Sequence, residues 1–127
     1  MLLEDYIARQ RAWSENTFGP GDRAHGVLNH IDKEVIEVLY EEPGNRLPEW
    51  IDIIILAFDG AWRDGHSPME IVEALQDKQT ENENRQWPDW RKFSENEAIE
   101  HIRDHIEEVK EHDQDHEPAS SRNQQLN

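Results

Sequence analysis

Cysteine is absent from this sequence, which excludes disulfide bridges, thiolate zinc sites and a cysteine nucleophile. Long apolar runs are also absent: the longest, Ile53–Phe58, is far shorter than the ~20 residues that a membrane-spanning helix needs. Leu2 and Leu3 are followed at once by Glu4 and Asp5, whereas a signal peptide would continue its apolar region. We therefore expect no membrane span, no secretory signal and a cytoplasmic location.

Positive charge is scarce. The 127 residues include 13 Lys and Arg against 29 Asp and Glu, so the formal net charge is −16. Such a charge opposes binding along nucleic-acid phosphates, so we expect no nucleic-acid partner. With 35% hydrophobic residues, the chain can build one modest core. We expect one folded domain over residues 1–110 and a polar, acidic, flexible tail over 111–127, where only Ala119 and Leu126 are apolar.

The apolar residues recur at the three- and four-residue spacing of helices that bury one face. Val27, Ile31, Val35 and Val38 follow this spacing, and proline and glycine clusters interrupt the pattern between segments. The segments between these clusters are joined by loops of the length usual in helical bundles. The sequence therefore predicts an all-α fold, a bundle of four to five helices, at about residues 3–17, 22–41, 47–62, 67–84 and 94–110.

The third segment is ambiguous, because its run of isoleucines would also suit a buried strand. Pro48 favours a first helical turn, and Glu49 and Asp52 follow where the helix dipole favours anions, so we predict a helix. Two later segments begin with the capping-box pattern, in which a serine and a glutamate three residues later bond to each other's backbone. These are Ser67 to Glu70 and Ser94 to Glu97.

Two pairs of acidic residues carry the chemical hypothesis: Glu34 with Glu37, and Glu49 with Asp52. Each pair has the i, i+3 spacing that projects from one helix face. If the turn at Pro43 folds the two helices antiparallel, Glu37 lies level with Glu49, and Glu34 lies level with Asp52. Four carboxylates this close cannot all remain ionised unless cations bind among them. Because the ligands are oxygens alone, we expect Mg²⁺ or Mn²⁺, with two or more ions per site.

The alternative is that these acids belong to ordinary solvated helix faces. A chain with 29 acidic residues contains such pairs by chance. However, Glu37 lies between Ile36 and Val38, and Asp52 lies between two isoleucines. Acids among apolar residues are costly unless they are paired or bound to a metal, so the site hypothesis is favoured.

Three further residues share one face of the fourth segment: Lys78, Asn82 and Arg85. Their donors could hold the β and γ phosphates of a nucleotide whose other oxygens bind the metals. Pairing with nearby acids such as Asp77 or Glu81 is an equally good interpretation of this face.

Candidate base-binding residues are Trp13, Phe18 and His30. Trp13 and Phe18 could stack on a nucleobase or simply fill the core. His30 precedes Glu34 by one helical turn and so shares the acidic face.

The acidic motif, Glu34-x-x-Glu37 followed by Glu49-x-x-Asp52, resembles that of the all-α nucleoside triphosphate pyrophosphohydrolases, the MazG-like superfamily. Over residues 4–108 the surrounding sequence looks like its dATP/dGTP diphosphohydrolase branch, which is found largely in phages. The segments that carry this likeness are Trp13-Ser14, Phe18-Gly19-Pro20-Gly21, His30-Ile31-Asp32-Lys33-Glu34, Glu49-Trp50-Ile51-Asp52, Ile55-Leu56-Ala57-Phe58-Asp59-Gly60-Ala61-Trp62-Arg63, Lys78-Gln79, Asn82-Glu83, Arg85 and Trp87-Pro88-Asp89-Trp90-Arg91.

The resemblance implies hydrolysis of dGTP, dATP or both to the monophosphate and pyrophosphate, in phage nucleotide-pool metabolism. In some phages the dGMP feeds the synthesis of 2-aminoadenine nucleotides. The resemblance assigns metal binding to the four acids and phosphate binding to Lys78, Asn82 and Arg85, and it places Trp13 beside the base. It also implies a homodimer or homotetramer, in the host cytoplasm if a phage encodes the chain.

For the mechanism, bound metals would neutralise the triphosphate and orient a water, while a carboxylate accepts that water's proton. Glu37 is the candidate for this general base. Two alternatives remain open at this stage: an acidic DNA mimic that blocks a nucleic-acid-binding protein, and a pyrophosphohydrolase of another nucleotide.

Overall fold

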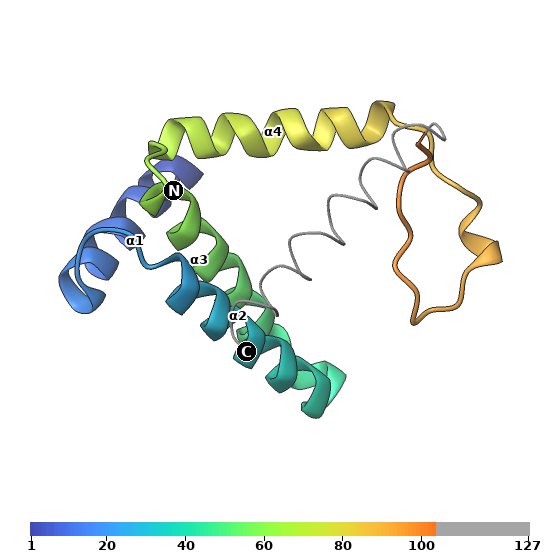
Figure 1. The fold of residues 1–127 in the computed structure, drawn as a ribbon, viewed down its shortest axis with the longest axis horizontal. Coiled ribbons are helices and arrows are strands. Elements are labelled where there is room, and N and C mark those ends of the chain that lie inside the picture. The colour runs from blue at the N-terminus through green and yellow to red at the C-terminus, as the bar shows by residue number, and fades with distance from the viewer. Residues whose placement is uncertain (104–127) are drawn as a thin grey trace, which may run out of the picture. The chain divides into compact units, whose positions relative to one another are not determined.

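Four α-helices and two short 3₁₀ turns make up residues 1–103, the part of the chain that the computed structural model describes (Figure 1). No strand occurs in this part, so the prediction of an all-α fold is confirmed. The helices are α1 (Leu3–Phe18), α2 (Ala24–Tyr40), α3 (Leu47–Arg63) and α4 (Pro68–Asn84), and the 3₁₀ turns are η1 (Pro43–Asn45) and η2 (Trp90–Lys92).

The chain divides into two compact units. The first is Met1–Gln79, and the second begins at Thr80, so α4 continues from the first unit into the second. Within residues 1–103, no helix has the length and apolarity that crossing a membrane would require.

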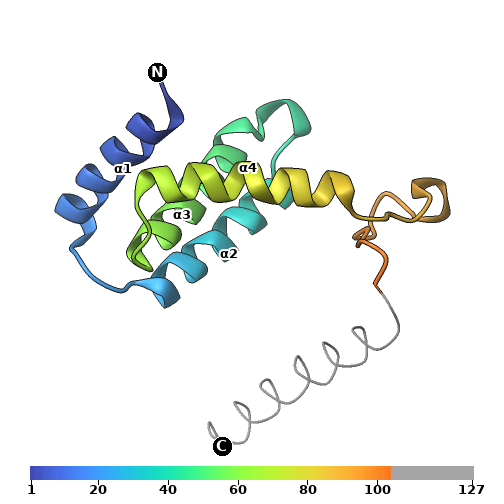
Figure 2. The same cartoon turned by 90° about the horizontal axis from the view of Figure 1, so that it is seen from above.

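Helix α3 is the central element of the first unit. The isoleucine-rich segment is a helix rather than a strand, and Pro48 occupies its first turn as predicted. It packs most extensively against α2, and α1 also packs against it. Figures 1 and 2 show α2 and α3 side by side with their chain directions opposed, because η1 reverses the chain between them.

The core of the first unit forms where α1, α3 and α4 meet. Ile7, Trp62 and Ile71 are its buried hydrophobic residues, and Tyr6 and Phe58 pack against them. Each of these apolar side chains leaves water on folding, which stabilises the packing of the three helices.

Turn chemistry sets the ends of these helices. Gly19 and Gly21, with φ values of 90° and 91°, follow the last residue of α1 in a backbone region that favours glycine. Before α4, the predicted capping box is present: the Glu70 backbone N–H donates to Ser67 Oγ over 3.2 Å, and the Ser67 N–H donates to Glu70 Oε1 over 3.3 Å.

The predicted helix over residues 94–110 is wrong for the portion that the structure describes, because residues 94–103 contain no helix. The Ser94 capping pattern forms an isolated turn instead, in which the Glu97 N–H donates to the Ser94 carbonyl oxygen over 3.2 Å. Ile99 and Ile102 are exposed here, so the apolar stripe lacks the packing that stabilises a short helix. The rest of this segment and the predicted tail, residues 111–127, lie outside the described residues.

Candidate functional site

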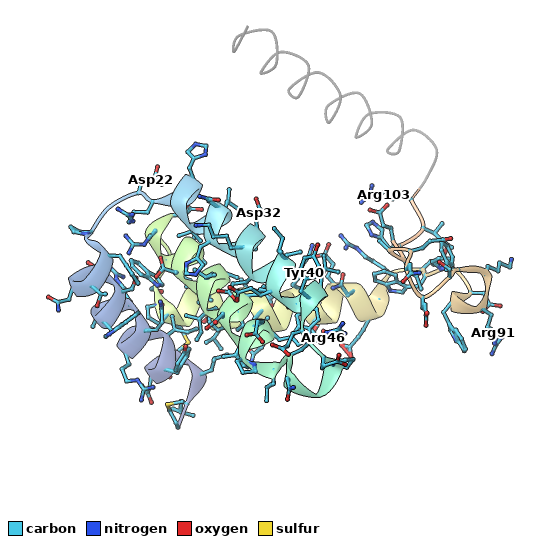
Figure 3. The ribbon with its side chains drawn as sticks, turned by 90° about the horizontal axis from the view of Figure 1, so that it is seen from below. Asp22, Asp32, Tyr40, Arg46, Arg91 and Arg103 are labelled. Atoms are coloured by element: carbon cyan, nitrogen blue, oxygen red, sulfur yellow. The ribbon has the colours of Figure 1, made fainter. Side chains whose placement is uncertain are left out.

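The α2–α3 hairpin carries the four acidic residues predicted as metal ligands. Glu34 and Glu37 lie on α2, and Glu49 and Asp52 lie on α3. The carboxyl group of Glu34 interacts electrostatically with both Glu37 and Asp52. The contribution of Asp52 shows that Glu34 lies near it across the turn, as an antiparallel hairpin predicts. Tyr40 and Arg46, labelled in Figure 3, mark the two sides of that turn.

Two carboxylate oxygens in this hairpin are buried without a partner. Glu34 is only 6% exposed, and neither its Oε2 atom nor Oε2 of Glu49 has a hydrogen-bond partner within the described residues. An unpaired buried carboxylate oxygen is costly, because it has lost water and gained no donor. A cation would satisfy both atoms, and carboxylate oxygens are ligands that Mg²⁺ and Mn²⁺ accept. The donor set therefore fits a divalent metal.

The electrostatics of Glu34 are those of a crowded acidic site. Burial raises the pKa of Glu34 above its ordinary value, and the hydrogen bond and negative charge of Glu37 raise it further, as does the charge of Asp52. His30 opposes these effects, with Nε2 3.3 Å from Glu34 Oε1. The single histidine beside Glu34 thus does not offset the effects of burial and of the two neighbouring acids.

The four carboxylates do not converge on a single point. Among residues 1–103, no three His, Asp or Glu side chains are placed so that they could hold one ion as they stand. Glu37 and Asp52 are exposed, whereas Glu34 is buried and its carboxylate contacts His30. Glu34 is thus the one buried member of the quartet, and Glu49 is half-buried.

Of the three predicted base-binding residues, Phe18 contacts Trp13 and shares a hollow with His30, whereas Trp13 does not line that hollow. The rings of Trp13 and Phe18 meet edge to face, with centroids 5.4 Å apart, but they are 57% and 51% exposed and so do not fill the core. Phe18 and His30 line one hollow of about 110 Å³. Its other lining residues are Arg23, Gly26, Val27, Leu56, Asp59 and Arg63.

Two of the three predicted phosphate-binding residues, Lys78 and Asn82, share one face of α4, and Arg85 directly follows the last residue of this helix. Arg85 Nη1 donates to Asn82 Oδ1 over 3.1 Å, and Arg85 also pairs with Glu81. The pairing with Glu81 is the alternative that the sequence left open for this face. Lys78 lies at the end of the first unit, one helical turn before Asn82.

A buried polar network between α1 and α3 was not predicted as part of the site. Asp59 accepts hydrogen bonds from Gln10 Nε2 at 2.9 Å, from Arg63 Nε at 2.5 Å and from Ser14 Oγ. Arg63 extends the network to the α1–α2 connection, because Nη1 donates over 2.9 Å to the carbonyl oxygens of both Gly19 and Gly21. The Arg63 and Asp59 side chains are 2% and 8% exposed, so the connection is anchored by a buried ion pair.

The network determines the ionisation of Asp59. Burial alone would raise the pKa of Asp59, but the hydrogen bonds from Ser14, Arg63 and Gln10 and the Arg63 charge lower it overall. A sequence signal for this network exists: Asp59 and Arg63 are spaced i, i+4, as are Gln10 and Ser14. Their partners are about 50 positions away in the chain, so spacing within one helix could not show that the two pairs meet.

Known proteins resemble this chain in both sequence and structure. The family model described as dATP/dGTP pyrophosphohydrolase matches residues 6–109. The fold is similar to a solved structure, that of the cyanophage S-2L MazG-like pyrophosphohydrolase bound to dGDP and three catalytic Mn²⁺ ions per active site. The two sequences are 25% identical, and the TM-score is 0.62. That match covers 81% of this chain and 99% of the cyanophage chain. The curated proteins include no match.

Proposed function

Since this chain belongs to the dATP/dGTP pyrophosphohydrolase family and is a MazG-like nucleotide pyrophosphohydrolase, we propose that it hydrolyses dGTP, dATP or both to the monophosphate and pyrophosphate. The observation that carries the assignment to the α2–α3 hairpin is the pair of buried, unpartnered oxygens, Oε2 of Glu34 and Oε2 of Glu49. Membership of this enzyme family also favours a catalytic metal site as the role of the acidic residues over the alternative of a DNA mimic.

Glu34, Glu37, Glu49 and Asp52 would hold the metal. The cyanophage relative binds three Mn²⁺ ions per active site, and on this likeness we propose two or more Mg²⁺ or Mn²⁺ ions here. The bound metal would neutralise phosphate charge and lower the pKa of a water. The exposed carboxylates of Glu37 and Asp52 can change rotamer at little cost, whereas buried Glu34 supplies a fixed position.

The remaining roles follow from the charge and position of each residue. Lys78, Asn82 and Arg85 would donate to the phosphates, where positive charge and an amide stabilise the developing negative charge. Glu37 is exposed beside Glu34, so its carboxylate oxygen would accept the proton of the attacking water. Trp13, Phe18 and His30 would contact the nucleoside.

The proposed metal role is tested by substituting one exposed acid on each helix. Glu37→Gln and Asp52→Asn should each lower the rate of pyrophosphate release from dGTP by at least about 100-fold, because each removes an anionic ligand but keeps the side chain's shape. Circular dichroism should show unchanged helix content. Asp32→Asn, an exposed acid on α2, is the matched control and should retain activity. Full activity in either test variant would exclude the metal role.

We also propose that the chain assembles with copies of itself, as a homodimer or homotetramer. The hairpin exposes many apolar side chains, which a second copy could cover. They are Leu28, Val35, Ile36, Leu39, Tyr40, Leu47, Trp50, Ile51 and Ile54.

The biological role that fits this activity is control of a phage nucleotide pool in the host cytoplasm. Cleavage of dGTP would supply dGMP, a precursor suited to the synthesis of 2-aminoadenine nucleotides. Assaying all four deoxynucleoside triphosphates for pyrophosphate release tests the substrate range, and a preference for a pyrimidine would contradict this role.

A further inference from the structure

The hollow beside Phe18 contains two arginines with different surroundings. Every nitrogen of the Arg63 guanidinium donates within the protein, to Asp59, Ser14 and the carbonyl oxygens of Gly19 and Gly21. Arg23 is exposed, and its guanidinium has no hydrogen-bond or ion-pair partner among residues 1–103. Arg63 therefore builds the wall of the hollow, while the donors of Arg23 are not used by any of residues 1–103.

Gly26 is a second unexplained feature of the same hollow. It is the third residue of α2, with no positive φ, so the backbone does not require glycine. A Cβ atom added there would meet only the Arg23 guanidinium, at 3.9 Å. Because glycine is a poorer helix former than alanine, the missing side chain needs another reason. A flat ligand lying against the helix would supply it.

The hollow is connected to the acidic site along one face of α2. Gly26, His30 and Glu34 follow one another at i, i+4 spacing, and Nε2 of His30 lies 3.3 Å from Oε1 of Glu34. Gly26 and Glu34 are separated by about 12 Å of helix rise. A base in the hollow would thus have its sugar near His30 and its phosphates toward the acids.

We propose that this hollow binds the purine base and that Arg23 selects guanine over adenine, an inference that rests on the proposed function and narrows its substrate. Guanine presents two acceptors, O6 and N7, which match the paired donors of a guanidinium. Adenine presents N7 beside an amino group, which a guanidinium cannot satisfy. Phe18 stacks on the base, and Gly26 leaves room for it.

The test compares kcat/KM for dGTP and dATP in three arginine variants. Arg23→Gln should lower the dGTP-to-dATP ratio by about tenfold or more and raise relative use of dATP, because glutamine pairs with adenine N6 and N7. Arg23→Lys keeps the charge and should retain part of the guanine preference. Arg9→Gln, which alters an arginine in the separate hollow lined by Tyr6 and Trp13, should leave the ratio unchanged.

Gly26→Ala provides an independent test, because its predicted effects on stability and on binding have opposite signs. The melting temperature should not fall, since the added methyl group clashes with nothing and favours the helix. KM for dGTP should rise several-fold. In the absence of metal, dGMP should raise the melting temperature of the wild type more than dAMP does, and this difference should disappear in Arg23→Gln.

The outcomes separate this inference from the proposed function. If the wild type releases pyrophosphate but Arg23→Gln keeps its dGTP-to-dATP ratio, or loses both substrates equally, Arg23 does not read the base. A changed ratio in Arg9→Gln would place the base in the other hollow and would likewise overturn the inference. If the wild type cleaves no deoxynucleoside triphosphate, the proposed function itself fails.

Discussion

The Asp59–Arg63 pair is the residue-scale feature that the fold depends on most clearly. The two side chains are almost fully buried, and Gln10 and Ser14 complete the hydrogen bonding of Asp59. A buried ion pair of this kind adds little net stability over an apolar pair, but the loss of one partner leaves the other charge buried and unpaired. The stability of the α1–α2 connection therefore depends on both members.

Asp59→Asn should lower the free energy of unfolding at pH 7 by about 3–5 kcal/mol, measured by urea denaturation. The pKa of Asp59 is lowered in the folded state, so the unfolded state binds the proton more readily. Its contribution is present above the unfolded pKa, near the ordinary value of 3.8, and is lost as the pH falls through the folded pKa. The difference between wild type and variant should thus narrow below about pH 4.

Asp64→Asn is the control for this prediction, because Asp64 is exposed one residue beyond the end of α3. Its effect should stay within about 0.5 kcal/mol at either pH. Two results would mean that the network does not depend on the Asp59 charge. One is an equal loss of unfolding free energy in both variants, and the other is a difference between wild type and Asp59→Asn that stays constant down to acid pH.

At the same scale, the sequence predicted part of the candidate site. Symmetry about Pro43 anticipated that Glu34 and Asp52 approach each other, because an antiparallel hairpin fixes which positions are level. The exposure of Trp13 and Phe18 was not predictable, since an aromatic residue on a helix is covered only if another element reaches it. The roles assigned to the acids, to Lys78 and to the other site residues stay predictions.

At the scale of elements, capping patterns alone do not decide whether a helix forms. The patterns at Ser67 and Ser94 are alike, yet α4 follows the first, whereas only a turn follows the second in residues 94–103. The difference lies in packing: Ile71 is buried in the core behind Ser67, whereas Ile99 behind Ser94 is exposed. Helix stability in proteins comes mainly from such tertiary contacts, which spacing along the chain does not show.

Ser67→Ala should therefore lower the free energy of unfolding by about 1 kcal/mol, because it removes the oxygen that accepts the Glu70 N–H. Ser94→Ala makes the same chemical change at a site that residues 95–103 do not continue as a helix, and it should cost less than about 0.5 kcal/mol. Thermal and urea unfolding followed by circular dichroism would measure both. Equal losses would contradict the distinction between the two segments.

At the scale of the whole molecule, apolar exposure on the hairpin contrasts with the strong negative charge of the chain. A net charge of −16 keeps copies apart, so their association requires a substantial apolar surface. Leu39 and Tyr40, near the end of α2, are among the most exposed apolar residues of this surface. Their exposure is the physical basis for the proposed homo-oligomer.

Leu39→Glu should shift the chain toward the monomer, because it places a charge in the proposed contact surface. Light scattering coupled to size-exclusion chromatography would report the mass. Leu75→Glu, at an exposed leucine on α4, is the control and should leave the mass unchanged. A wild type that is monomeric at all accessible concentrations would contradict the proposed assembly.

The central claim, that α2 and α3 together hold divalent metal ions, is tested most directly by Mn²⁺ binding followed by electron paramagnetic resonance. The wild type should bind at least two ions per chain in the presence of a non-hydrolysable dGTP analogue. Glu34→Gln and Glu49→Gln should each lose one or more of these ions while keeping their helix content. Wild-type stoichiometry and affinity in both variants would show that the metal binds elsewhere and would contradict the account.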